Sequence, residues 1–175
     1  MSKQKSITRK DFLSGGFIAA AGLVLAPELL LAAQQNKPVA LASELVNEFV
    51  KVAHSDFDKV KLMLDEHPLL LNASWDWGGG DFETAIGAAG HMGLKDMAKY
   101  LLEKGARADL FVLTMLGKTE IVKSILKAYP PLLNSAGPHG FTLLHHAEKG
   151  GKDSEELFNH IKSLGLTETH RPLAG

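Results

Sequence analysis

Three carboxylates and two histidines are the residues of this chain best suited to acid–base chemistry. Asp76, Asp81 and Glu83 lie in one short stretch, and with His91 or His139 they could supply a general acid and a general base. The acidic residues can also be explained by their usual roles in turns and at helix starts, without any catalysis. Asp81 can accept a hydrogen bond from the backbone two residues on, and the charge of Glu83 suits the start of a helix. The chain has no nucleophile elbow, phosphate-binding glycine loop or paired-carboxylate motif, so we expect no enzyme.

The histidines raise the question of a metal site. His145 and His146 are adjacent, and adjacent residues of a helix point about 100° apart, so they seldom share one ion. His91 and His139 show no H-x-x-x-H pattern and no regular His/carboxylate spacing that would indicate zinc or iron. The absence of cysteine excludes a thiolate zinc site and a disulfide. We therefore predict no metal and no cofactor.

Both tryptophans of the chain lie in a glycine-rich loop. The segment NASWDWGGGDFETAI contains Trp75 and Trp77 directly before three consecutive glycines, 78–80. These glycines allow the loop to turn back on itself. Two interpretations remain open: the indoles are exposed and contact a partner, or they cover an apolar gap, with a gain of about 2–3 kcal/mol for each buried ring.

Amphipathic helices must position these residues. In Thr84–Ala106, apolar residues recur at i, i+1, i+4 and i+5, which places Met97, Ala98, Leu101 and Leu102 on one helical face. The segments Val60–Asn72 and Ile121–Asn134 repeat this stripe, and each helix should stop before a proline. The pattern predicts a chain of helix pairs.

The sequence TAIGAAGHMGLKDMAKYLLEKGA, Thr84–Ala106, resembles the ankyrin repeat, whose first helix carries T-P-L-H-x-A and whose period is about 33 residues. Thr142–Ala147 keeps the threonine, leucine, histidine and alanine of this motif. The resemblance implies an all-α fold, an ankyrin-repeat solenoid of about four helix-turn-helix repeats with short hairpin loops. The repeats would cover about 43–72, 73–106, 107–134 and 135–165. It also implies that the motif histidine, His145, bonds backbone in the turn.

The spacing of the repeats departs from the family pattern. Between the second and third repeats, GARADLFVLTMLG leaves no residues for the usual β-hairpin finger. The finger before it, Trp75–Glu83, is enlarged, and the last finger is GPHGF, Gly137–Phe141. A stack of so few repeats should fold as one unit.

Partners of ankyrin-like stacks bind where the fingers and the exposed ends of the short helices line one concave face. In this chain the corresponding positions are Trp75, Trp77, Phe82, His91, Met92, Met115, Leu116, His139 and Phe141. An aromatic surface of this kind is typical of binding sites. We expect a monomeric, non-enzymatic protein-binding module or scaffold whose partner is another protein.

Two alternatives to the binding module remain open. One is a small hydrolase or metal-dependent enzyme that uses Asp81, Glu83, His91 and His139. The other is a structural subunit of an envelope complex. The net charge of −1 does not favour binding to nucleic acid.

The first 33 residues differ from the rest. A basic head precedes an apolar, glycine-diluted stretch that is too short for a confident membrane span, which is typical of an export signal peptide. ITRKDFL, Ile7–Leu13, resembles the twin-arginine signal, with Lys10 in place of the second arginine. General secretion and an uncleaved anchor are the alternatives, and the cleavage site is left open. We expect a linker at 34–42, a C-terminal tail at 166–175, and a bacterial protein that is periplasmic or secreted, with no stable membrane span once the signal is removed.

Overall fold

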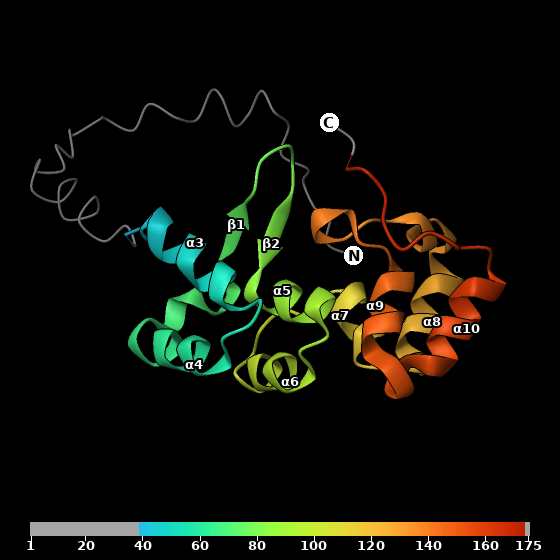
Figure 1. The fold of residues 1–175 in the computed structure, drawn as a ribbon, viewed down its shortest axis with the longest axis horizontal. Coiled ribbons are helices and arrows are strands. Elements are labelled where there is room, and N and C mark those ends of the chain that lie inside the picture. The colour runs from blue at the N-terminus through green and yellow to red at the C-terminus, as the bar shows by residue number, and fades with distance from the viewer. Residues whose placement is uncertain (1–38, 174–175) are drawn as a thin grey trace, which may run out of the picture. The chain divides into compact units, whose positions relative to one another are not determined.

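The structure, a computed structural model, describes residues 39–173, and helices dominate them (Figure 1). The expected export segment, 1–33, lies outside the described residues. The α-helices are α3 (Ser43–Val52), α4 (Phe57–Glu66), α5 (Ala85–Met92), α6 (Lys95–Glu103), α7 (Leu110–Met115), α8 (Thr119–Ala128), α9 (Leu143–Gly150) and α10 (Glu155–Ser163). No helix in 39–173 has the length and apolar character needed to cross a membrane.

Short 3₁₀ turns and one small sheet complete the described part of the chain. The turns are η1 (Pro68–Asn72), η2 (Pro130–Asn134), η3 (Pro138–Gly140) and η4 (Gly151–Ser154), and the strands are β1 (Ser74–Asp76) and β2 (Phe82–Thr84). A mostly helical chain with a two-stranded sheet agrees with the expected all-α class.

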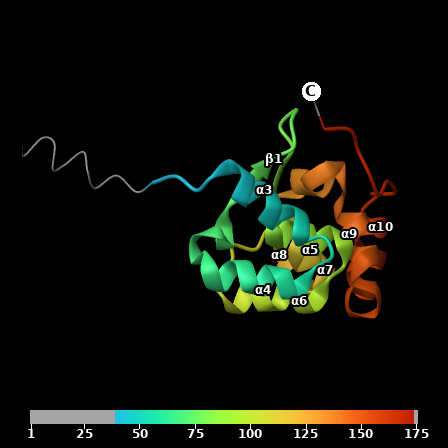
Figure 2. The same ribbon diagram turned by 60° about the vertical axis from the view of Figure 1, so that its left-hand side comes forward.

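Consecutive helices pack as pairs. Within residues 41–173, α3 packs on α4, α5 on α6, α7 on α8 and α9 on α10. The first helices of the pairs also contact one another in the order α3, α5, α7, α9. Figures 1 and 2 both show α4 and α6 below α3 and α5. The two inner first helices, α5 and α7, are therefore held on both sides by their neighbours.

Local capping explains where several helices begin. Side chains of Asp56, Thr84 and Asp109 accept hydrogen bonds from backbone N–H groups in the first turns of α4, α5 and α7. Each of these bonds satisfies a donor that the helix itself leaves unpaired.

The core confirms most of the predicted apolar stripe. Met97, Ala98 and Leu101 of α6 are buried, and Leu102 is partly buried and packs against the same core. One buried cluster joins the first two helix pairs and α7, and a second joins α8 to α10. A helix pair buries little apolar surface by itself, so the pairs depend on one another.

The tryptophan loop forms a β-hairpin. β1 and β2 pair antiparallel, with Trp75 opposite Glu83, and the hairpin stands above α3 and α5 (Figure 1). Gly78, Gly79 and Gly80 all have positive φ, between 62° and 100°, which glycine adopts without steric cost. By contrast, 104–109, all of it described, contains no strand between α6 and α7. The hairpin thus lies in the segment that the spacing predicted to be enlarged, and the segment predicted to lack a hairpin contains no strand.

Candidate metal centre

Four side chains from separate parts of the fold converge on one point. His54 follows the end of α3, Glu83 lies on β2, His91 is in the last turn of α5, and His139 is in η3. One possible ligand atom from each of these residues lies within 4.8 Å of the others. Helix ends and hairpins thus bring together residues that are far apart in the sequence.

The imidazoles surround the carboxylate closely. His91 Nε2 lies 2.9 Å from Glu83 Oε1 and 3.2 Å from His54 Nε2. His139 Nε2 and His54 Nε2 lie 3.3 Å and 3.4 Å from Glu83 Oε2. Three Nε2 atoms therefore point toward a single carboxylate.

Two of the rings are oriented by bonds at their other nitrogen. His54 Nδ1 donates to the carbonyl oxygen of Val50 at 3.0 Å, and His139 Nδ1 donates to Asp81 Oδ2 at 2.7 Å. A neutral imidazole whose Nδ1 is the donor has a free electron pair on Nε2. The same pairing of a histidine with a carbonyl or carboxylate orients metal ligands in proteins. Both rings are therefore set to donate electrons toward the centre.

Glu83 is buried, and its two oxygens face different neighbours. The indole N–H of Trp77 donates to Oε2 at 2.9 Å, whereas Oε1 lies 2.9 Å from His91 Nε2 without forming an aligned hydrogen bond. Burial by itself would raise the pKa of this carboxyl, but His91, His54 and Trp77 together hold it below the usual value. The group is thus a carboxylate, the form that binds metal ions.

His139 adopts a strained backbone conformation. Its φ is +56°, and it is the only non-glycine residue with positive φ in the described part of the chain. Asp81 accepts bonds from both the backbone N–H of His139, at 2.9 Å, and the ring Nδ1. Strain of this kind costs about 1–3 kcal/mol and is concentrated at functional sites. Asp81 therefore stabilises both the positive-φ backbone conformation of His139 and the position of its ring.

A stack of rings supports His91. Its ring stacks on Phe141 at 5.2 Å between centroids, and Phe141 stacks on His145 at 4.0 Å. His145 Nε2 donates to the carbonyl oxygen of His91 at 2.9 Å. The motif histidine therefore bonds backbone, as expected, but the carbonyl belongs to the neighbouring short helix. The last finger and α9 thereby fix the position of the ligand candidate on α5.

The predicted partner-binding residues do not form one exposed face. Phe82 and Met92 are exposed, and Trp75, Trp77, His139 and Phe141 are partly buried. His91, Met115 and Leu116 are buried, so the expectation that they are exposed is wrong. The short helices pack against both neighbours, which covers these ends.

Trp77 has a more specific position than either sequence interpretation offered. Its ring lies 5.8 Å from His139 and 6.3 Å from His54, between ring centroids. The indole thus lies against the histidines and bonds Glu83, and it is not fully exposed. Trp75 packs edge-on against Trp77 at 6.4 Å.

Sequence reasoning missed His54. His54 lies just past the end of α3 and corresponds in the repeat alignment to Met92, the last residue of α5, so extending that alignment to the first helix pair would have revealed it. The expectation of no metal ligands stays a prediction, although His54, Glu83, His91 and His139 are grouped closely enough to hold an ion. Spacing rules find ligands on one helix, whereas these four come from separate elements.

No family model, curated protein or solved structure matches this chain. The functional interpretation consequently depends on the geometry of the cluster.

Proposed function

We propose that this protein binds a divalent transition-metal ion through His54, Glu83, His91 and His139. The observation that carries the proposal is the convergence of three imidazole Nε2 atoms on one buried carboxylate. Each donor except His91 has an outer-shell partner fixing its orientation: Val50, Asp81 or Trp77. That second layer is characteristic of metal sites.

The donor set indicates the kind of ion. Three imidazoles and one carboxylate suit zinc and the neighbouring first-row metals, whereas soft Cu(I) prefers thiolates and thioethers, and magnesium and calcium prefer oxygen donors. The carboxylate supplies one negative charge against the two charges of the ion. Glu83 would therefore bind the ion more strongly than a neutral fourth ligand would.

The scaffold we propose is an ankyrin-like stack. Paired helices, a hairpin finger before α5 and the row of first helices support this proposal. The centre lies where fingers and short-helix ends meet, the region that the resemblance assigned to a protein partner. Asp81, Glu83, His91 and His139 of the enzyme alternative recur here, with Asp81 orienting a ligand. Export to the periplasm is likewise a proposal and rests on the sequence of residues 1–33.

Metal content and calorimetry test the proposal. Purified protein is stripped with a chelator and titrated with Zn²⁺, and we expect one ion per chain. Loss of outer-shell partners costs about 10–100-fold in affinity, so His91→Gln and Glu83→Gln, which remove ligands, should cost at least that much. His67→Gln is the matched control, since His67 is exposed at the end of α4, outside the cluster. Unchanged zinc binding in both ligand variants, or none in the parent protein, would overturn the proposal.

A further inference from the structure

The arrangement of the four candidate ligands also indicates a coordination geometry. We infer that the metal centre is a closed, tetrahedral site, selective for zinc over ions that prefer six ligands. This inference rests on the proposed function and deepens it, because it names the ion and the number of protein ligands.

The distances between the histidine rings are the first observation that supports a tetrahedral site. A metal–nitrogen bond of about 2.0–2.1 Å places each imidazole centroid about 3.2 Å from the ion. Tetrahedral bond angles then separate the centroids by about 5.2 Å, whereas the right angles of an octahedron give about 4.5 Å. The observed separations are 5.0 Å for His54–His91, 5.2 Å for His91–His139 and 6.0 Å for His54–His139. Two of the three separations match a tetrahedral ion, the His54–His139 separation is wider, and all three exceed the value for three adjacent corners of an octahedron.

Two distances between candidate ligand atoms are also close to those of a tetrahedral site. Adjacent ligands of a tetrahedral ion with bonds of this length lie about 3.3 Å apart. His54 Nε2 and His91 Nε2 are 3.2 Å apart, and His91 Nε2 is 2.9 Å from Glu83 Oε1.

The fourth position belongs to Glu83. Trp77 donates to Oε2 and His91 Nε2 faces Oε1, so we expect the carboxylate to bind the ion through Oε1 alone. With three imidazoles this completes four ligands from the protein, the arrangement of sites that hold zinc, whereas catalytic zinc keeps one position open. The centre therefore holds its ion without a position for a substrate.

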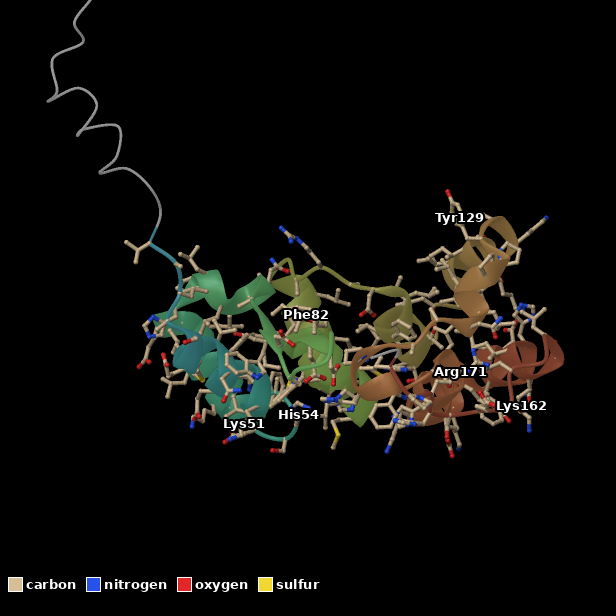
Figure 3. The ribbon with its side chains drawn as sticks, turned by 90° about the horizontal axis from the view of Figure 1, so that it is seen from above. Lys51, His54, Phe82, Tyr129, Lys162 and Arg171 are labelled. Carbon is tan, nitrogen blue, oxygen red and sulfur yellow. The ribbon has the colours of Figure 1, made fainter. Side chains whose placement is uncertain are left out.

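The ion reaches the centre from one side. The Glu83 and His91 side chains are 0% and 4% exposed, whereas those of His54 and His139 are 24% and 31% exposed. Figure 3 shows His54 at the edge of the molecule near Lys51. Entry past His54 and His139 allows the ion to exchange with solvent.

Cobalt(II) tests the geometry, because its visible absorption is strong in a tetrahedral site and weak in an octahedral one. One equivalent of Co²⁺ should produce the intense bands, and one equivalent of Zn²⁺ should abolish them. Mn²⁺ should displace Co²⁺ only at an excess on the order of 100-fold or more. Co²⁺ that binds with weak absorption alone would overturn the tetrahedral site and leave the proposed function standing. Failure of both Co²⁺ and Zn²⁺ to bind would overturn both.

Glu83→Gln tests whether the site is closed. If Glu83 is a ligand, this variant should shift the cobalt bands and weaken binding. Unchanged bands and affinity would mean that three histidines and a solvent molecule hold the ion, and the closed site would be wrong. Trp77→Phe provides a second test that leaves every ligand in place: affinity should fall while the bands stay intense. The cobalt spectrum of the parent protein remains decisive if Glu83→Gln fails to fold.

Discussion

His91 Nε2 lies 2.9 Å from Glu83 Oε1, although one residue closes α5 and the other lies on the hairpin strand before it. The carboxylate is held from two sides, since the hairpin also places Trp77 Nε1 on its second oxygen. With His54 and His139 nearby, the hairpin, two helix ends and the last finger meet at one centre. Binding an ion there should affect the stability of several elements at once.

Zinc should stabilise the fold. A ligand that binds the native state alone, at 100 times its dissociation constant, adds about 2.7 kcal/mol to the free energy of unfolding. We expect the melting temperature of stripped protein to rise on adding Zn²⁺ and to fall again with chelator. Calorimetry on the parent protein and on His91→Gln checks this, and an equal rise in the variant would point to binding elsewhere.

Trp77 should matter more for the metal than for the fold. Trp77→Phe keeps an aromatic ring but removes the N–H that holds Glu83 Oε2, so zinc affinity should fall about 10–100-fold. Trp75→Phe is the control, because Trp75 packs beside Trp77 without contacting the carboxylate through a hydrogen bond. Isothermal titration of both variants separates the roles; equal effects would contradict the assignment.

Leu101 should contribute more to the stability of the fold than Leu102, the next residue of α6. It is fully buried, whereas its neighbour Leu102 is only partly buried, so Leu101→Ala should cost about 2–5 kcal/mol and Leu102→Ala clearly less. Urea unfolding followed by circular dichroism measures both. Because the helix pairs depend on one another, each variant should unfold in a single transition. Two separate transitions would show that the pairs fold independently.

His146 should make the metal-free protein less stable in acid. Burial lowers the pKa of this side chain to about 4, against 6.5 in the unfolded chain. Below pH 6.5 His146 is protonated in the unfolded chain but still neutral in the folded protein. The free energy of unfolding therefore falls as the pH drops toward about 4. The full loss is about 3 kcal/mol.

His146→Gln is the comparison for this effect. Glutamine can still donate to the carbonyl oxygen of Thr142, which accepts from His146 Nδ1, but it does not titrate. The difference in unfolding free energy between pH 7 and pH 4.5 should therefore be smaller in the variant. An unchanged difference would mean that other groups cause the acid sensitivity.

The helix pairs were predictable from the sequence because their signals are local. The apolar stripe of Thr84–Ala106, the prolines after α4 and α8, and the glycines of the tryptophan loop each act within a few residues. Such patterns determine where a helix begins and ends and where the chain can turn. They placed the enlarged finger and the segment that lacks one.

The clustering of the four candidate metal ligands was decided by tertiary structure alone. His54, Glu83, His91 and His139 have no regular spacing, and they meet because α3 and α5 pack together while η3 lies beside α5. Burial of Met115 and Leu116 likewise depends on neighbours that no local pattern reveals. Which side chains share a point in space follows from the packing of whole elements, and that packing is a sum of many weak contacts between distant parts of the chain.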